Sequence, residues 1–192
     1  EPLSSGPVIN ATGVVVGDAE LTPPLADAAV HAMTQIAGEY HRRGAELQKA
    51  IERELCSLTG AEETLVLSSF DAALNVVIAT TTANREVLVA EGGAVPNAGI
   101  DWRRLAARHS AVLRTSAGDA VALAAAAGQG GPPAAIVRSP EAEGLATTDE
   151  VASIAKRANA LFVDVAPLAG VINPTSYGLQ SIETLRERLA AG

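Results

Sequence analysis

Apolar and polar residues follow one another in blocks whose spacing predicts strands and helices in turn. The short apolar runs that predict buried strands cover residues 64–67, 86–90, 111–114, 134–138 and 161–164. The segments with helical spacing cover residues 25–40, 45–58, 71–82, 100–108, 118–127 and 148–158. Short strands separated by helices are typical of βαβ units. We therefore expect an α/β fold with three layers and a mostly parallel sheet.

The N-terminal part of the chain has a different pattern. Residues 8–16 predict an extended segment, and Pro23-Pro24 separates them from the first helix. The second helix should end at Gly60, because glycine is favoured in the left-handed conformation that terminates helices. We therefore expect an N-terminal arm with the first helix over residues 1–44. An α/β large-domain portion should follow over residues 45–192.

Composition and charge exclude several classes of function. The 192 residues carry a formal net charge of −8, so a nucleic-acid-binding surface is not expected. Arg103-Arg104 and the basic residues 41–43 are short and are interpreted as solvated helix faces. No apolar run reaches the ~18 residues of a membrane-spanning helix, so no membrane partner is expected. A single cysteine, Cys56, indicates a small packed residue and a reducing, cytoplasmic location.

Candidate binding residues follow from the rule that open parallel sheets bind ligands at the carboxyl ends of their strands. Ser68 and Ser69 lie between a predicted strand and helix, where hydroxyls and free backbone N–H groups could hold a phosphate. The alternative is an ordinary helix N-cap, with Ser69 or Asp71 as the capping residue. Asp71 would also repel a phosphate.

Asp164 at the end of the last predicted strand is the other candidate. Its carboxylate could bind the protonated ring nitrogen of a cofactor, or it could cap the following turn. The glycine-rich residues 128–133 follow a helix and precede a strand, so they predict a turn rather than a phosphate loop. No histidine is placed to activate a serine, and no spacing indicates a metal site. We therefore predict no catalytic residue and no metal ligand.

Several segments resemble one known family. Residues 8–16 (VINATGVVV), 32–40 and 54–62 (ELCSLTGAE) are similar to the catalytic domain of the bacterial L-seryl-tRNA(Sec) selenium transferase family. Residues 161–164 and 177–179 continue the likeness, which also extends to D-glucosaminate-6-phosphate ammonia-lyases. The resemblance implies the large domain of a fold-type-I pyridoxal-phosphate enzyme, without its small domain. It also implies a homo-oligomer with active sites between subunits.

The resemblance also assigns roles to the candidate residues. It implies that Asp164 is the partner of the pyridine nitrogen and that the turn from Ser68 to Ala72 binds the phosphate. A carboxylate at the ring nitrogen keeps it protonated, so that the ring can accept electrons.

The chain departs from the family pattern at several of the same places. Residues 17–21 replace a His-Thr-Asn-Leu-Gly-Arg run, and Phe70-Asp71 replaces small or amide residues in the phosphate loop. Gly92-Gly93 replaces the ring that stacks on the cofactor, and residues 165–167 replace a Gly-Ser-Gly-like turn. These departures weaken the likeness at the cofactor site itself.

The largest departure is the missing Schiff-base lysine. The only lysines, Lys49 and Lys156, lie in amphipathic helices and should face solvent. We therefore expect no covalent binding of pyridoxal phosphate, and the family's tRNA-binding module is absent as well. Two interpretations stay open: most of the large domain of a longer enzyme, or a non-catalytic relative that serves as an oligomerisation or interaction module. A truncated large domain should expose apolar surface where its later strands belong, and should therefore self-associate.

Overall fold

The computed structural model describes residues 25–38, 45–82, 84–91, 100–138, 145–166, 170–171, 173, 175, 178 and 183–191. By its internal contacts the chain divides into Glu1–Leu47 and Gln48–Gly192. The first unit contains helix α1 (Asp27–Ala37) and the start of helix α2 (Ala45–Thr59), both within or close to predicted helices. The extended segment predicted at 8–16 lies outside the described residues.

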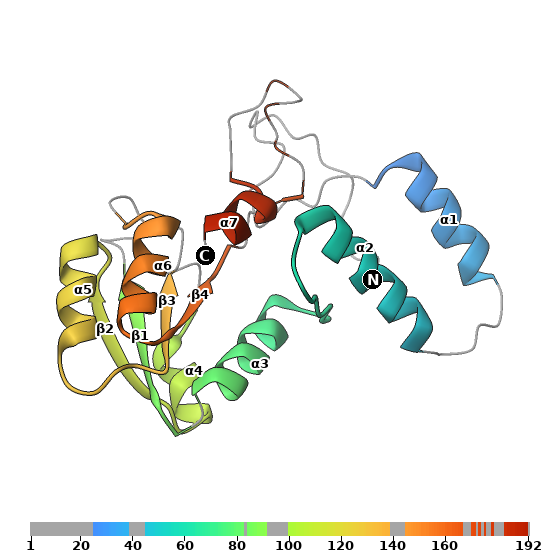
Figure 1. Cartoon of the computed structure of the whole chain (residues 1–192). Coiled ribbons are helices and arrows are strands. Elements are labelled where there is room, and N and C mark those ends of the chain that lie inside the picture. Colours follow the sequence, from blue (N-terminus) through green and yellow to red (C-terminus); the bar gives the residue numbers. More distant parts are fainter. Residues whose placement is uncertain are drawn as a thin grey trace, which may run out of the picture. The chain divides into compact units, whose positions relative to one another are not determined.

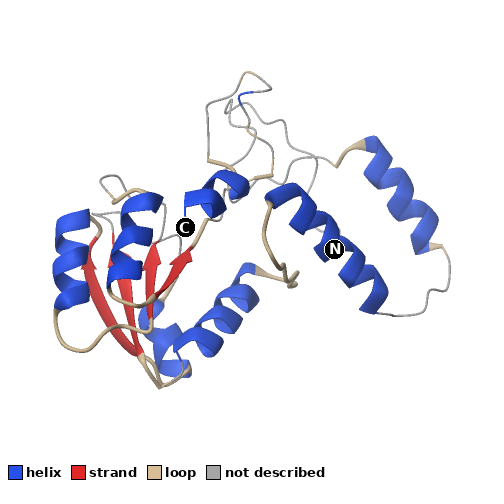
Figure 2. Cartoon of the chain, in the orientation of Figure 1, coloured by secondary structure: helices blue, strands red, loops and turns tan. Residues whose placement is uncertain are grey.

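Gln48–Gly192 contains the sheet, shown by the arrows in Figures 1 and 2. Its strands are β1 (Glu86–Glu91), β2 (Val112–Ala117), β3 (Ala135–Arg138) and β4 (Leu161–Asp164). Its further helices are α3 (Phe70–Thr82), α4 (Trp102–Arg108), α5 (Ala120–Gly128), α6 (Thr148–Arg157) and α7 (Leu185–Ala191). The strands have the order β2-β1-β3-β4, and all three neighbouring pairs are parallel. The predicted parallel sheet is thus confirmed.

Both faces of the sheet are covered by helices, because successive strand side chains point to opposite sides. Val87 and Val89 of β1 pack with residues of α3 and α4 in one buried cluster. Leu88 and Ala90 pack with residues of α5 and α6 in a second cluster on the other face. These four β1 side chains are at most 1% exposed. The predicted three-layer α/β architecture is therefore confirmed.

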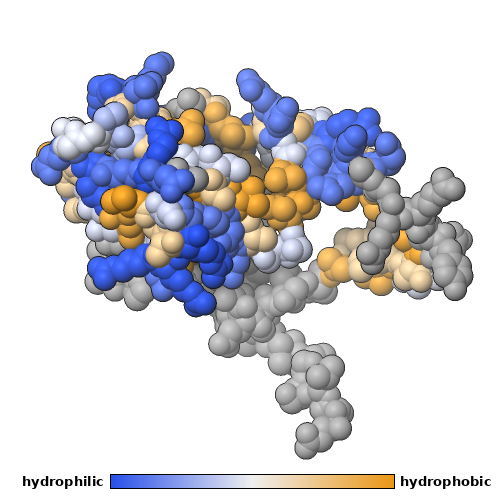
Figure 3. Space-filling model, turned by 90° about the horizontal axis from the view of Figure 1, so that it is seen from below, coloured by the Kyte–Doolittle hydropathy of each residue, from blue (hydrophilic) through white to orange (hydrophobic). Residues whose placement is uncertain are grey.

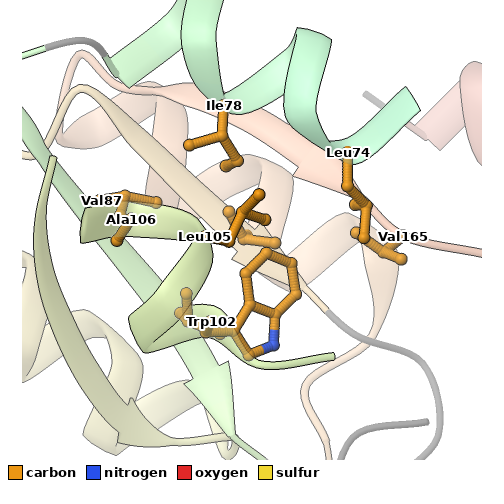
Figure 4. Close-up of a cluster of buried hydrophobic side chains, with 9 residues drawn as sticks. Leu74, Ile78, Val87, Trp102, Leu105, Ala106 and Val165 are labelled. Carbon is orange, nitrogen blue, oxygen red and sulfur yellow. The ribbon is translucent and has the colours of Figure 1, made fainter. Parts of the chain in front are cut away.

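Trp102, the only tryptophan, lies in the first of these clusters and is 5% exposed. Figure 4 shows its ring packed beneath Leu105 and Ile78. Its indole N–H is buried and has no hydrogen-bond partner in the described part of the chain. Trp102 is therefore a core residue.

The helix ends follow from local sequence. Thr147 caps α6 in a capping box with Glu150: its hydroxyl accepts from the Glu150 N–H, and the Glu150 carboxylate accepts from the Thr147 N–H. Asp119 caps α5 by accepting from two backbone N–H groups of the first turn. Gly60 follows α2 at φ 81°, in the left-handed conformation that was expected.

The strand predicted at residues 64–67 is wrong. This segment is irregular, and its polar groups bind α2: the Thr64 hydroxyl donates to the Glu52 carbonyl at 2.7 Å, and the Val66 N–H donates to the Glu52 carboxylate at 3.3 Å. Leu65 is 60% exposed. Apolar surface of this kind appears orange in Figure 3. A short apolar run does not specify which partner its backbone finds, and here α2 competes with the sheet.

Candidate functional site

Arg138 and Asp164 lie side by side at the carboxyl ends of β3 and β4, where they are register partners. The Arg138 guanidinium donates from Nη1 to Oδ1 of Asp164 at 3.1 Å. The second oxygen, Oδ2, accepts from Nη1 of Arg188 at 2.7 Å. The three side chains are only 11–13% exposed. Asp164 thus lies at the predicted edge of the sheet, but both of its oxygens bind arginines.

Arg138 is fixed by the sheet as well as by the carboxylate. Its carbonyl accepts from the Val165 N–H at 2.9 Å, which continues the ladder one residue beyond β4. Its Nε donates to the carbonyl of Ala146, just before α6, at 2.9 Å. Arg138 therefore ties β3, β4 and the start of α6 together.

Arg188 comes from α7, a helix that the hydrophobic pattern did not predict. Its guanidinium also lies 3.5 Å from the carboxylate of Glu183, which is itself 55% exposed. Its Nε is buried and has no hydrogen-bond partner in the described part of the chain. A buried donor without a partner destabilises the folded state. The guanidinium of Arg188 therefore has one donor without a hydrogen-bond partner, at the position where Arg138 has one.

Helix α7 is set locally by a capping box. The Thr184 N–H and hydroxyl donate to Glu187 Oε2 at 2.7 and 2.9 Å, and the Glu187 N–H donates back to the hydroxyl. The bond from the Thr184 N–H, and then that from its hydroxyl, hold the pKa of Glu187 below its ordinary value of 4.5. Arg186 donates to the carbonyl of Ser57 at 3.1 Å. These contacts place Arg188 over the end of β4.

Ser68 and Ser69 lie at the start of α3 and are exposed. Ser69 Oγ accepts from the Ala72 N–H at 3.1 Å, as an N-cap residue does. Asp71 is exposed in the first turn and lines, with Arg104 and Arg108, a hollow of about 280 Å³ between α3 and α4. Ser69 therefore has the capping role that was one of the two expectations, and the phosphate seat stays a prediction.

The core links the two predicted parts of the site. Leu74 of α3 and Val165, the residue after Asp164, belong to one buried cluster, and Figure 4 shows both side chains. The core therefore joins α3 to the end of β4, but Val165 packs on the α3 side of the sheet, so the side chain of the preceding residue, Asp164, points to the opposite face.

Neither lysine belongs to this edge. Lys156 is exposed and lines a hollow of about 630 Å³ with Arg85 and Leu161, which lie where strands begin. Lys49 is exposed on α2. The prediction that both lysines face solvent is confirmed.

The described arrangement does not fit a protonated pyridine nitrogen at Asp164. Two guanidinium groups already face this carboxylate, so their charge exceeds its own. A ring cation at the same oxygens would be a third positive charge in a largely buried place, where repulsion is poorly screened. Sequence reasoning found Asp164 but missed both arginines. Arg138 could have been found, because it ends the neighbouring predicted strand.

Among the described residues, no helix is long and apolar enough to cross a membrane. The same residues contain no group of three or more His, Cys, Asp or Glu side chains that could hold a metal ion.

Comparison with known proteins gives a consistent family. The family described as L-seryl-tRNA selenium transferase matches residues 8–103, half of the chain. The L-seryl-tRNA(Sec) selenium transferase of Moorella thermoacetica is 38% identical over 98 residues, which are 45% of this chain and 20% of that protein. The enzyme of the same name from Carboxydothermus hydrogenoformans is 33% identical over 94 residues, 44% of this chain and 20% of its own length. The matches thus span about a fifth of these relatives.

A solved structure of O-acetylhomoserine sulfhydrylase from Wolinella succinogenes superimposes with a TM-score of 0.54. The match covers 67% of this chain and 37% of that chain, at 17% sequence identity. At this identity the likeness concerns the fold alone. The expected architecture, the large domain of a fold-type-I pyridoxal-phosphate enzyme, is thereby confirmed.

Proposed function

Since the chain belongs to the L-seryl-tRNA selenium transferase family, we propose that residues 1–192 are a large-domain scaffold of that type that does not catalyse transfer by itself. One observation carries the proposal: both lysines are exposed, and Lys156 lies where the strands begin, away from Asp164. Pyridoxal phosphate supplies an electron-accepting ring to such enzymes when a lysine holds it. Residues 1–192 therefore offer no lysine amine at the carboxyl ends of the strands, where pyridoxal phosphate would be held.

The cofactor proposed by family membership is pyridoxal phosphate, bound without a covalent bond. Ser68 and Ser69 are the proposed contacts of its phosphate, supported by their exposure at the start of a 13-residue helix. Asp164, at the end of β4, would become the partner of its ring nitrogen only if an arginine released the carboxylate. The two arginines oppose that role, so binding through the phosphate should dominate.

Partners and location belong to the same proposal. We expect a homo-oligomer in the cytoplasm, without a role for nucleic acid in this part of the chain. Exposed apolar side chains support association: Val30 and Met33 of α1 are 48% and 59% exposed. The net charge of −8 opposes contact with nucleic acid.

Reductive trapping tests the absence of covalent binding. The protein is mixed with pyridoxal phosphate, reduced with borohydride and digested, and the peptides that contain Lys49 and Lys156 are measured by mass spectrometry. We expect only slow, non-saturable labelling, equal at the two lysines, because both are exposed amines. The matched control is the Lys49→Arg, Lys156→Arg double variant, which should show none. Saturable labelling of either lysine at low cofactor concentration would contradict the proposal.

A second candidate function is a non-catalytic oligomerisation module, favoured by the doubly paired Asp164 and by α1, which has no buried residue. Sedimentation velocity tests it with Met33→Glu, on the exposed helix. This change should weaken self-association, because it places a charge in an apolar contact. Gln35→Glu introduces the same charge at a polar position of the same helix and should have a smaller effect. A monomeric wild-type protein would contradict this candidate.

A further inference from the structure

The two arginines that bind Asp164 are held in different ways. Arg138 is the register partner of Asp164 in the adjacent strand, and it also donates to the Ala146 carbonyl. Its side chain therefore also ties β3 to the segment before α6. Arg188 reaches the carboxylate from α7, 24 residues further along the chain. Its buried Nε has no partner in the described part of the chain, so its environment is incomplete.

The two arginines also differ in their effect on the net charge around the Asp164 carboxylate. Asp164 and Arg138 together form a neutral pair, which leaves Oδ2 able to accept a hydrogen bond from a cation. Arg188 takes that acceptor at 2.7 Å and adds one positive charge. Glu183 compensates weakly, because it is 3.5 Å from Arg188 and 55% exposed, so water screens it. A second cationic donor at Oδ2 would therefore meet both an occupied acceptor and a like charge.

We propose that Arg188 is the specificity-determining residue at the end of β4: its guanidinium takes the oxygen of Asp164 that a cationic ring nitrogen would bind. The site as it stands selects against a protonated pyridine ring, and a neutral residue at 188 reverses that selection. This inference rests on the proposed function, because it assumes that the ring of pyridoxal phosphate or a related compound reaches this edge. The inference goes beyond the proposed function, because it names Arg188 as the residue that determines whether a cationic ring binds at Asp164.

The test uses pyridoxamine 5′-phosphate, which needs no lysine, and its deaza analogue, in which a C–H group replaces the ring nitrogen. Binding to the whole chain is measured by equilibrium dialysis and by the fluorescence of Trp102. This single tryptophan shares a buried cluster with Val165, the neighbour of Asp164. Arg188→Met should bind pyridoxamine phosphate at least tenfold more tightly than the wild type, while affinity for the deaza analogue should change less than twofold.

Three variants separate the charge from other effects. Arg188→Lys keeps a cation near Oδ2 and should return the affinity for pyridoxamine phosphate to the wild-type range. Arg157→Gln removes an exposed arginine at the end of α6, away from Asp164, and should change neither affinity. Arg188→Gln keeps a neutral donor for Asp164, and it serves if the methionine variant fails to fold. It should show a smaller gain in the same direction.

The ultraviolet absorbance of the bound ring gives an independent measurement, because it depends on protonation of the ring nitrogen. The ring bound to Arg188→Met should remain protonated to a higher pH than the ring bound to wild type. Equal gains for both ligands would overturn the inference, since the arginine would then act only as a steric obstacle.

Equal affinity of wild type and Arg188→Met for pyridoxamine phosphate would overturn the inference and leave the proposed cofactor intact. Absence of binding to every variant would contradict both the inference and the proposed cofactor. The two failures are therefore distinguishable.

Discussion

The start of α3 and the end of β4 are the two predicted parts of one site, and they are built in opposite ways. At α3 the contact is local: Ser69 caps an N–H group three residues further along, and both serines are exposed. At β4 the contacts are long-range: Asp164 binds arginines 26 and 24 residues away and is 13% exposed. One part is open to a ligand, whereas the other is already occupied by the protein.

This difference shows which part limits binding. An exposed helix start can accept an anion with little rearrangement, because its backbone donors already face water. A carboxylate that binds two guanidinium groups must lose at least one of them before it accepts another cation. We therefore expect the contacts at Asp164, rather than those at the start of α3, to determine which ligands this chain binds.

Removal of the Asp164 carboxylate should have the largest effect. Asp164→Ala leaves Arg138 and Arg188 largely buried without their shared partner, and we expect a loss of about 3 kcal/mol in the free energy of unfolding. Urea denaturation measures it. Glu63→Ala removes an exposed carboxylate and should change stability by less than about 0.5 kcal/mol. A loss as small as that of the control would mean that the two ion pairs stabilise little.

The capping role of Ser69 at the start of α3 is tested by substituting each of the two serines. Ser69→Ala removes the acceptor of the Ala72 N–H and should cost about 1 kcal/mol of unfolding free energy. Ser68→Ala is the matched control, and its effect should be below about 0.5 kcal/mol. Thermal unfolding followed by circular dichroism measures both. Equal losses would show that Ser69 is not the dominant cap.

The prediction that the start of α3 can bind an anion is tested by removing the charge of Asp71. Asp71→Asn removes a negative charge beside the proposed phosphate contacts, where repulsion between unit charges at 4 Å in water is about 1 kcal/mol, or about a fivefold change in affinity. We expect inorganic phosphate to bind more tightly by about that factor in a titration followed by NMR. Asp149→Asn, in the first turn of α6, should leave phosphate binding unchanged. No change for Asp71→Asn would leave the serines with a capping role alone.

The smallest expected effect concerns the helix that carries Arg188. The pKa of Glu187 is lowered by the Thr184 N–H and hydroxyl, so the ionised carboxylate stabilises the fold above its ordinary pKa of 4.5. That contribution is lost as the pH falls below 4.5 and through the lowered value. The unfolding midpoint of Glu187→Gln should therefore depend less on pH in this range than that of the wild type. Glu63→Gln should keep the wild-type profile, and identical profiles for all three proteins would contradict the role of Glu187.

Much of the fold was predictable because it depends on local sequence. Apolar spacing predicted α3, β1, β3, α6 and β4, and Gly60 ends α2 as expected. Ser69 as a cap was one of two stated alternatives, and it follows from hydroxyl chemistry at a strand-to-helix junction. The position of Asp164 at the sheet edge followed from strand direction.

Other features were decided by tertiary structure alone. Residues 64–67 have the composition of a strand, yet their hydrogen bonds go to Glu52, because α2 reaches them and no neighbouring strand does in the described structure. Helix α7 is short, and its position beside β4 follows from long-range contacts that no periodicity encodes.

The site shows the same division. The order of residues alone predicts a carboxylate at the end of the last strand and places both lysines in amphipathic helices away from it. The contacts of Arg138 and Arg188 with that carboxylate could not be predicted, because ion pairs between residues more than 20 positions apart depend on how strands and helices pack. What Asp164 can bind is therefore set by packing, while its presence at the edge is set by the chain.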